Sequence, residues 1–516
     1  MQFHSSPKVF KNYKSAYPKG TIANAKKFLK DMGLNLEYEQ KKLKKNNCEL
    51  YFGNLWYNSS IISSGKGTTN ELSCASTYCE ILERLLNGIS KLSPFLTEKQ
   101  KEIFKKQKEK IDKKIDIKEF LQNFPEVDLN KLKKHNIFKN WKNAHSLCEE
   151  KNISVPDLFI SNISRSNGCA AGNTLEEAIS QAFCEICERY STIEHIINKK
   201  SAPTVKKQTI KNKKIQNFIA LFESLNFKIE IKDLSFGNRV PVMGIIFTNR
   251  NLVNEEANLR KQVYYKTLAV GSHFDLEEAI TRCFIEQIQF YNDFKDFQNP
   301  GCLNPDFHTT RGKAPTINVL KQYFTKEETK KIIQTFNQTK RYIPLVMKWR
   351  SFTDFDFLKG ENISFGDLQS KETKDFLEEI ELIKNISLKN NWRTLILDYS
   401  VDKCPIKVVR VVIPSISDLL RYKYKRINDI DKLTVNILQS EEENITKKNN
   451  MNNKIFHFLE LALVENLLPY PPYRLLNVFP IRIMENLFKM SLILKKTRKY
   501  NILKNILTEI AIYRKY

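Results

Sequence analysis

The sequence predicts a mixed α/β (α+β) protein built from repeated strand–turn–helix units. Three observations support this prediction. Short runs rich in β-branched and aromatic residues alternate with longer segments of helical periodicity, which is typical of mixed folds. One segment that reads as strand or loop, glycine turn and capped helix occurs three times. The 516 residues, of which 41% are hydrophobic, suffice for a large core and for one to three domains.

The first elements along the chain are a helix and a strand region. Apolar periodicity predicts a helix over Thr21–Met32, which ends at Gly33 because glycine readily adopts the left-handed conformation. Lys41–Asn47 is rich in Lys and Asn, and we expect a loop there. Glu49–Ile62 mixes aromatic and β-branched residues and predicts strand. Glu98–Phe120 predicts a highly charged, solvated helix inserted into the domain.

The alternation continues and then gives way to a polar segment. Composition turns polar and charged in residues 436–454, which predicts a linker. We therefore expect one domain over residues 1–435, in which 95–155 is partly a charged helical insertion, and a helical carboxyl-terminal extension over 455–516. Five further strands are expected at Phe227–Ile231, Val240–Thr248, Val263–Val270, Thr394–Leu397 and Ile406–Ile413.

The net charge is the most conspicuous feature of the composition. Lys and Arg number 84 against 58 Asp and Glu, which gives a formal charge of +26. Such a charge suits RNA binding, but the Lys residues are scattered and no motif interleaves basic with aromatic residues. We interpret the surplus as solvated surface, concentrated in Lys41–Lys45, Lys99–Lys118 and Lys447–Lys454.

Cysteine usage and hydropathy predict a cytoplasmic location and no membrane span. Ten Cys do not make a disulfide framework in a chain of this length. The first residues are polar and basic, unlike a signal peptide, and no apolar run approaches the ~18 residues that a membrane span needs. Cys184 and Cys187 lie in a strongly helical pattern without a second Cys pair, so we expect two small buried side chains there and no metal site.

The repeated segment is the most informative feature of the sequence. Its copies begin GTTNELSCAS at Gly67, GNTLEEAISQ at Gly172 and HFDLEEAITR at His273. Each first residue lies 13 positions before a glutamate, namely Glu80, Glu185 or Glu286. Each helix then carries polar residues three apart, which share one helix face. These residues are Glu80 and Glu83, Glu185 and Glu188, and Glu286 and Gln289.

Acidic pairs with largely apolar neighbours point to a cation. A carboxylate beside apolar side chains is costly unless a cation neutralises it. One copy alone would suggest a solvated helix face with Glu–Arg pairs, whereas three copies favour a shared site. Carboxylate oxygens suit Mg²⁺, and Mg²⁺ commonly brings phosphates, usually those of ATP. Arg84, Arg189 and Arg282 would offset the phosphate charge. The chain contains neither a Walker A string nor a kinase-like glycine loop.

These motifs resemble those of the YcaO family. The matching strings are SSGKGTT…CEILERL from Ser63, SNGCAAGNTLEEA…CEICERY from Ser166, GSHFDLEEAITRCFIEQIQ from Gly271 and VVRVVIPSISDL from Val408. The resemblance covers about residues 1–430 and implies an α/β domain in which strand–helix units surround an ATP site. Ala170 departs from the pattern, since a serine is common there and a hydroxyl contact would be lost.

The resemblance also implies roles for individual residues, namely those at positions that match functional positions of the family motifs. Glu83, Glu185, Glu188 and Glu286 would bind Mg²⁺. The residues implied for ATP binding are Lys14, Thr21, Glu80, Arg84, Asn173, Glu177, Arg189, Arg282 and Gln289. Lys14 and Thr21 rest on the shortest match, and a surface Lys and an ordinary helix cap are the alternatives. The sequence identifies no catalytic base.

The resemblance also implies a reaction and several alternatives. Family enzymes use ATP to phosphorylate a peptide backbone amide, and a Cys, Ser, Thr or sulfide nucleophile then yields an azoline or thioamide. The segment around Pro469–Pro472 is followed by a helical pattern, which favours a non-azoline member of the family. Such a member would act as accessory factor in methylthiolation of a small-subunit ribosomal protein. Its partner would be the methylthiotransferase. An azoline-forming cyclodehydratase, a thioamide synthetase and a non-catalytic ATP-binding scaffold are the alternatives. Family members are often homodimers.

Overall fold

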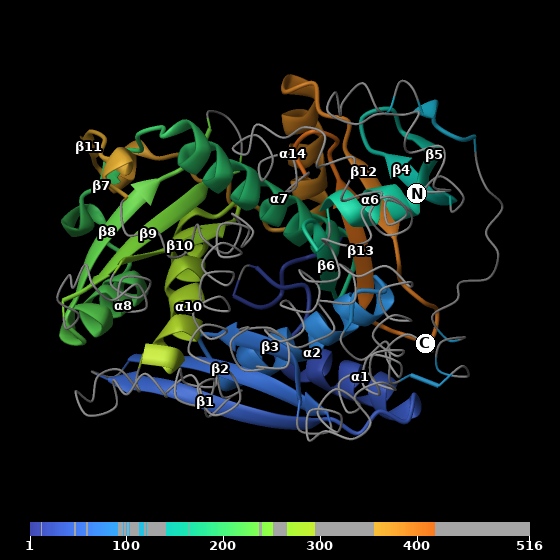
Figure 1. Ribbon diagram of the computed structural model, residues 1–516, viewed down its shortest axis with the longest axis horizontal. Coiled ribbons are helices and arrows are strands. Elements are labelled where there is room, and N and C mark those ends of the chain that lie inside the picture. The colour runs from blue at the N-terminus through green and yellow to red at the C-terminus, as the bar shows by residue number, and fades with distance from the viewer. Residues whose placement is uncertain are drawn as a thin grey trace, which may run out of the picture. The chain divides into compact units, whose positions relative to one another are not determined.

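The described part of the protein combines three β-sheets with helices that pack between and beside them. The computed structural model describes residues 1–90, 141–294 and 355–417, apart from 12, 46–47, 58–59, 165, 237–239 and 251–265, together with 96, 97, 100, 103, 113–117 and 120. The predicted mixed class is confirmed (Figure 1). The predicted linker over 436–454 and the helical extension over 455–516 lie outside the described residues.

The amino-terminal region forms a three-stranded antiparallel sheet covered by two helices. Its strands are β1 (Glu37–Lys45), β2 (Cys48–Tyr57) and β3 (Ser60–Gly67), in that order. The helices α1 (Pro18–Asp31) and α2 (Asn70–Leu86) pack on each other, and α2 packs on β2 and β3 (Figure 1). The predicted end of the first helix is confirmed, because Gly33 has a left-handed φ of 74°.

Two expectations in this part of the chain are wrong. Lys41–Lys45 is not a loop but part of β1, whose backbone pairs with β2 while its Lys side chains follow an edge strand, a common protection against further strand pairing. The predicted helix over Glu98–Phe120 is interrupted, since Lys114 forms a parallel bridge with Ser154. Phe120 is fully buried, so this segment is anchored by apolar contacts and is not wholly solvated.

The other described strands form two five-stranded sheets. One has the order β10–β9–β8–β7–β11, and the other has the order β5–β4–β12–β13–β6. The first comprises β7 (Thr204–Val205), β8 (Phe227–Asp233), β9 (Val242–Asn249), β10 (Lys266–Ser272) and β11 (Asn362–Ile363). The second comprises β4 (Trp141–Ser146), β5 (Lys151–Pro156), β6 (Cys169–Gly172), β12 (Leu395–Asp398) and β13 (Lys407–Val412). Strands β8, β9, β10, β12 and β13 confirm the predicted strands, whereas β4 and β5 fall where an insertion was expected.

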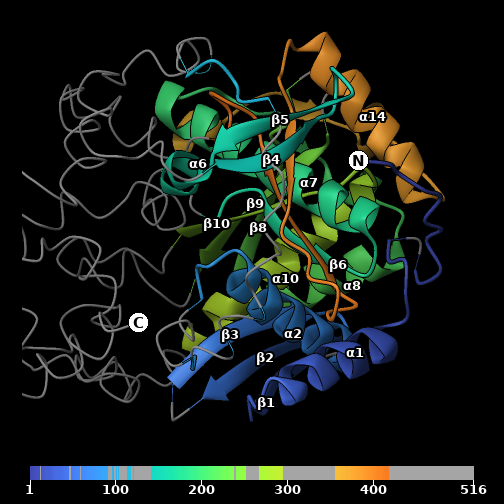
Figure 2. The same ribbon diagram turned by 90° about the vertical axis from the view of Figure 1, so that its right-hand side faces the viewer.

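The helix α7 (Leu175–Asn198) is the central packing element. It contacts β6 and β13 of one five-stranded sheet and β9 and β10 of the other (Figures 1 and 2). Further helices are α6 (Asp157–Ser164), α8 (Lys213–Ser224), α10 (Leu276–Phe294) and α14 (Phe376–Lys389), with 3-10 turns η2 (Lys207–Thr209), η8 (Asp356–Leu358) and η9 (Phe365–Asp367). Among the described helices, none is both long and apolar enough to cross a membrane.

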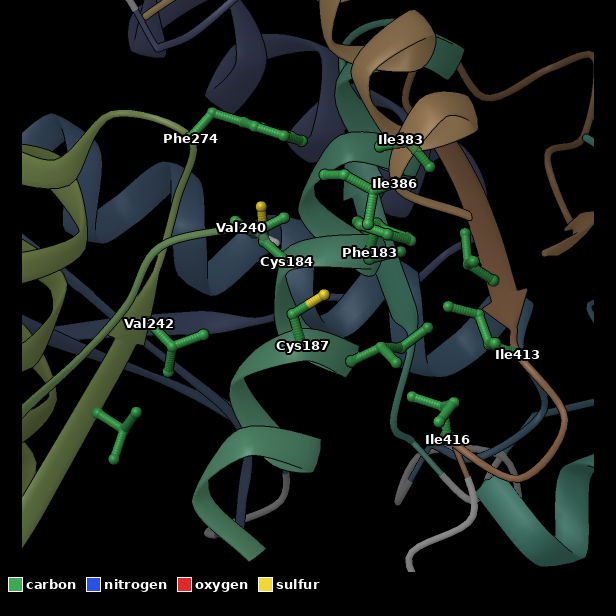
Figure 3. Packing of buried hydrophobic residues seen from close by; sticks show 14 of the residues in the cluster. Phe183, Cys184, Cys187, Val240, Val242, Phe274, Ile383, Ile386, Ile413 and Ile416 are labelled. Carbon is green, nitrogen blue, oxygen red and sulfur yellow. The ribbon is translucent and has the colours of Figure 1, made fainter. Parts of the chain in front are cut away.

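The main core forms around the apolar face of α7. Phe183, Cys184 and Cys187 point from this helix into a cluster with Val242 and Ile383 (Figure 3). Cys184 and Cys187 are 1% and 3% exposed, which confirms the prediction of two small buried side chains. Burial raises the pKa of the Cys184 thiol to about 12, so this side chain is an uncharged packing group.

Replacement of Phe183 tests the importance of this core. Phe183 is fully buried, so Phe183→Ala leaves a cavity and should lower the free energy of unfolding by about 3–5 kcal/mol. The control is Leu388→Ala on α14, because Leu388 is 52% exposed and its loss should change stability by less than about 0.5 kcal/mol. Urea unfolding followed by circular dichroism measures both effects, and equal losses would contradict the assignment of the core.

Candidate functional site

Three strand–turn–helix units supply the side chains of the candidate site. They are β3 with α2, β6 with α7, and β10 with α10, as the repeated segment predicted. The side chain of Thr69 accepts a hydrogen bond from the first turn of α2, and Thr174 does the same for α7. Asp275 accepts from Glu277 N at 2.8 Å at the start of α10. These capping residues start all three helices at the same distance from the repeated glutamate.

Glycines at the strand ends let the helices approach closely. A Cβ atom on Gly67 would lie 2.5 Å from the Ser73 amide nitrogen, and one on Gly172 would lie 2.7 Å from the Ala178 amide nitrogen. Any larger residue would therefore push the helix away from its strand. The short turns set the depth at which each helix enters the site.

Acidic side chains from the three helices come together in one carboxylate cluster, as the spacing predicted. The carboxyl group of Glu83 on α2 interacts electrostatically with Glu185 on α7, and Glu185 interacts with Glu286 on α10. We call the following residues the carboxylate cluster: Glu80, Glu83, Glu185, Glu188 and Glu286. The predicted Gln289 lies on α10, but its side chain is outside the described part of the structure.

Burial and mutual repulsion make two carboxylates of this cluster, those of Glu83 and Glu185, hard to ionise. Burial raises the pKa of Glu83 to about 8, with smaller contributions from Glu185 and Glu80. Burial also raises the pKa of Glu185, and Glu286 adds to the effect, although Arg189 and Arg84 oppose it. The cluster therefore has an excess of negative charge that a bound cation would relieve.

Basic side chains lie against each acidic pair. Arg84 contacts Glu80 at 3.6 Å and Glu83 at 3.5 Å, and Arg189 lies 3.7 Å from Glu185. Arg189 also lies 3.9 Å from Glu188. Both contacts match the predicted grouping of each Arg with its own acidic pair.

Lys66 was missing from the predicted site. Its Nζ atom lies 2.7 Å from Glu286 Oε1, and its side chain is 16% exposed. The residue comes from the end of β3, directly before Gly67, and so belongs to a different unit from its partner. Its place before a glycine turn in the first repeat was the available signal, but nothing in the sequence indicated the partner.

The donor set fits Mg²⁺, although the present side-chain arrangement is not that of a coordinated ion. Carboxylate oxygens are ligands that Mg²⁺ favours, and their raised pKa values reflect a need for positive charge. Within the described residues, no three acidic, His or Cys side chains are placed to hold one ion together. Lys66, Arg84 and Arg189 supply the positive charge in this arrangement.

A second polar group forms where the amino terminus meets the start of α7. Lys14 Nζ lies 3.1 Å from Glu177 Oε1, and Ser15 Oγ also donates to Glu177. Thr21 Oγ1 donates to Asn173 Oδ1 at 2.7 Å, and Asn173 donates to Glu177 from its backbone and side-chain nitrogens. We call these five residues the amino-terminal cluster. The structure thus brings Lys14 and Thr21 to Asn173 and Glu177, four residues that the resemblance grouped.

The environment of Glu177 keeps its carboxyl group ionised. Burial raises the pKa of Glu177, but Lys14, Ser15 and Asn173 outweigh burial and hold the pKa below its ordinary value. A capping box would have Glu177 accept from the Thr174 amide, yet Glu177 accepts from Asn173 N at 3.1 Å. The carboxylate of Glu177 therefore binds the other residues of the amino-terminal cluster and does not complete a capping box.

The two clusters adjoin at Cys79 on α2. The thiol of Cys79 interacts electrostatically with Lys14 and Glu177 of one cluster and with Glu83 of the other. Burial raises the pKa of this thiol to about 12, so Cys79 itself adds no charge. Residues of both clusters therefore lie within electrostatic range of one side chain.

Arg282 contacts the end of β10 and the first turn of its own helix. Its Nη1 atom donates to the Ser272 carbonyl at 2.9 Å, and its Nε atom lies 3.9 Å from Glu278. Arg282 precedes Glu286 by one helical turn, whereas Arg84 and Arg189 follow Glu80 and Glu185 by one turn. This position directs the guanidinium toward the start of α10. Ala170, the departure from the motif, is buried in β6.

Arg410 is a buried charge behind the carboxylate cluster that sequence reasoning missed. Its Nε donates to Asn87 Oδ1 at 3.3 Å and its Nη1 to Ser161 Oγ at 2.7 Å. Asn87 Nδ2 in turn donates to the Glu83 carbonyl at 3.0 Å. Arg410 therefore holds the last turn of α2, which carries Glu83. A single Arg within the apolar run VVRVVI was the available signal.

Comparison with known proteins places these units in one matched region. The model of the YcaO cyclodehydratase family, described as ATP- and Mg²⁺-binding, matches residues 64–417. Among curated proteins, one from Haemophilus influenzae described as "Uncharacterized protein" is 35% identical over 161 residues, which cover 31% of this chain and 26% of that relative. The match therefore spans about a quarter of the relative's length.

One solved structure shares the fold at low sequence identity, and a second shows a weaker likeness. A "Heterocyclase in complex with substrate and Cofactor" is 18% identical with a TM-score of 0.55, covering 81% of this chain and 55% of that one. "The structure of YcaO from Methanopyrus kandleri bound with AMPPCP and Mg2+" is 15% identical with a TM-score of 0.49 and covers 80% of this chain and 95% of that one.

Glu83→Gln tests the charge state of the cluster in metal-free buffer. Because the folded pKa of about 8 exceeds the unfolded value of about 4.3, the folded protein binds more protons between about pH 5 and pH 8, and its stability falls as pH rises. Glu83→Gln removes this loss, so its stability relative to wild type should rise by on the order of 2 kcal/mol from pH 5 to pH 8. Urea unfolding at both pH values measures the difference.

The control for this experiment is Glu223→Gln, since Glu223 pairs with Lys207 at the exposed surface. That variant should follow the wild-type pH dependence within experimental error. A Glu83→Gln profile parallel to wild type would contradict the raised pKa of Glu83.

Proposed function

This chain belongs to the YcaO family, and from that membership we propose that it uses ATP and Mg²⁺ to phosphorylate a backbone amide oxygen of a peptide or protein. The observation that carries the proposal is the carboxylate cluster, in which acids from three helices converge and burial raises the pKa values of Glu83 and Glu185. A purely structural role for five clustered carboxylates would be costly. Bound Mg²⁺ would give the cluster positive charge, and it would bring the phosphates with it.

In this proposal the carboxylate cluster holds the metal and the amino-terminal cluster contacts the nucleotide. Glu83, Glu185, Glu188 and Glu286 are the proposed metal ligands, and bound Mg²⁺ would neutralise charge on the transferred phosphoryl group. Glu80 and Arg84, which contact each other beside these ligands, are proposed nucleotide contacts. The remaining proposed nucleotide contacts are Lys14, Thr21, Asn173, Glu177, Arg189, Arg282 and Gln289.

The chain's own residues then position the reactants. Arg84 and Arg189 can turn from their Glu partners toward phosphate oxygens, because contacts of 3.5–3.9 Å are loose for ion pairs. Ionised Glu177 keeps Lys14 and Asn173 in place at the start of α7. Holding the phosphate and the amide in line supplies much of the rate acceleration in such a transfer.

For the acceptor we propose a protein rather than a natural-product precursor. In this reading the chain is a non-azoline member that assists β-methylthiolation of a small-subunit ribosomal protein, with the methylthiotransferase as partner. The sequence supports this choice, because the helical pattern that follows Pro469–Pro472 favours a non-azoline member of the family. An azoline or thioamide product, or ATP binding without turnover, are the outcomes that would replace it.

Substitution in the cluster tests the site itself. Glu188→Ala and Glu286→Ala should each lower the kcat of Mg²⁺-dependent ATP hydrolysis roughly 100-fold or more, because each removes a proposed ligand of the Mg²⁺ that would neutralise charge on the transferred phosphate. The control is Glu194→Ala on the same helix α7, where Glu194 pairs with Lys200. Circular dichroism checks that each variant is folded. Wild-type protein that binds no ATP would overturn the proposal.

Product analysis tests the acceptor and the reaction. Wild-type protein is incubated with Mg²⁺, ATP, the ribosomal protein and the methylthiotransferase, together with a methyl donor, a sulfur source and a reductant. The two partner proteins should stimulate ATP turnover, and mass spectrometry should detect a methylthio group on the ribosomal protein. Glu188→Ala should abolish this stimulation. Loss of one water from a Cys- or Ser-containing peptide would indicate an azoline product instead, and exchange of oxygen for sulfur would indicate a thioamide. Full methylthiolation with Glu188→Ala would favour a scaffold.

A further inference from the structure

An ion pair that is not part of the predicted site lies at the base of the amino-terminal segment. Lys8 Nζ lies 2.5 Å from Glu379 Oε1, and their side chains are 2% and 0% exposed. Lys8 also donates to Thr373 Oγ1 at 2.7 Å and lies 5.1 Å from the centre of the Phe376 ring. Ser180 on α7 donates to the same glutamate. The pair therefore joins the amino terminus to α14 and α7.

A buried ion pair is weak evidence for stability by itself. Desolvation of the two charges can cost as much as their attraction returns, and an apolar pair of the same volume would often serve the core as well. What a charged pair adds is a defined position, because both charges need their partners and tolerate no other arrangement. Lys8 and Glu379 thus suggest a need to hold the amino terminus in one place.

The segment next to Lys8 is attached to the starts of α7 and α14. The backbone nitrogen of His4 donates to Glu176 at 2.9 Å, and that of Ser6 donates to Asp375 at 2.7 Å. The Ser6 hydroxyl lies 2.7 Å from the Thr174 hydroxyl, which itself caps α7. We call residues 4–11 and 13–15 the amino-terminal strap.

The other end of the strap belongs to the proposed nucleotide site. Lys14 and Ser15 both contact Glu177. The Phe10 and Lys14 backbones exchange two hydrogen bonds, with N–O distances of 3.1 and 3.2 Å, which closes a tight turn between Lys8 and Lys14. The Tyr13 ring packs edge-on against His273 at 6.5 Å. Only a short, hydrogen-bonded turn separates the buried anchor from Lys14.

We propose that Lys8 and Glu379 form a positioning pair, which anchors the amino-terminal strap so that Lys14 and Ser15 stand at Glu177 and thereby sets the affinity for the nucleotide. The identity of the ligand rests on the proposed function, whereas the anchoring does not. Lys14 has a side chain that is 30% exposed, so its own ion pair holds it weakly. Apparent affinity falls in proportion to the time that a binding group spends out of place.

The experiment removes both charges together, because a lone buried charge could unfold the protein. The variant is Lys8→Met/Glu379→Gln, and the control is Lys207→Met/Glu223→Gln, which removes the same charges from a pair whose side chains are 37% and 43% exposed. Hydrogen exchange of residues 13–17 reports the position of the strap. Calorimetric titration with a non-hydrolysable ATP analogue and Mg²⁺ reports affinity.

We expect faster hydrogen exchange in residues 13–17 and about tenfold weaker binding of the analogue in the paired variant. The kcat of ATP hydrolysis at saturating ATP should stay within about twofold of wild type, because Lys8 and Glu379 do not touch the reacting groups. In a Lys14→Met background the paired change should weaken binding no further, since its effect acts through Lys14. The control variant should match wild type in every measurement.

Separate results overturn the two parts of this inference. Unchanged exchange of residues 13–17 in the folded paired variant contradicts the anchoring role. An equal loss of affinity with and without Lys14 contradicts the action through Lys14 and indicates general destabilisation. Wild-type protein that fails to bind the analogue contradicts the proposed function and the affinity role, while the exchange measurement still decides whether the pair anchors the strap.

Discussion

Repulsion among buried carboxylates is the constraint around which this structure is arranged. Like charges from α2, α7 and α10 share one partly buried space, and burial with mutual repulsion raises the pKa values of Glu83 and Glu185. Such a group persists only where the surrounding fold holds it in place and where cations are at hand. Arg84 and Arg189 meet part of this need from the same helices, one turn beyond the acids. The negative charge that these two Arg residues do not compensate favours a bound metal ion, which would carry a phosphate ligand.

The repeated strand–turn–helix unit explains how three separate helices reach one point. Each unit begins its helix from a capped turn after a strand, so the repeated glutamate falls at the same height in every copy. On α7 the polar start of the helix and the acidic pair belong to the two adjoining clusters. Glu177 and Glu185 are about two turns, or roughly 12 Å, apart along the axis. One helix therefore spans the distance between the group proposed to bind the nucleotide and the group proposed to bind its metal.

Sequence reasoning could predict what local pattern controls. Repetition and capping predicted the three helices and the convergence of their acids, and the family resemblance assigned Lys14 and Glu177 to the same nucleotide site, without predicting their contact. Contacts between distant segments were beyond its reach, because no local periodicity connects Lys66 with Glu286 or Lys8 with Glu379. The Lys-rich segment over residues 41–45 misled the prediction, since an edge strand tolerates the same side chains as a loop. In the third copy the order of Arg and Glu reverses, and Arg282 contacts Ser272 and Glu278 near the start of α10.

The whole chain carries a net positive charge, whereas the carboxylate cluster carries negative charge, and the two act together on a nucleotide. A formal charge of +26 raises the local concentration of anions, including nucleotides and acidic partners, over distances of about a Debye length. In the proposed function the carboxylate cluster would repel free phosphate groups and accept them together with a divalent cation. The long-range field would then attract any nucleotide, whereas the local field would select the metal complex. This division would explain how a strongly basic protein places its chemistry on glutamates, and why its Lys residues need no motif to contribute.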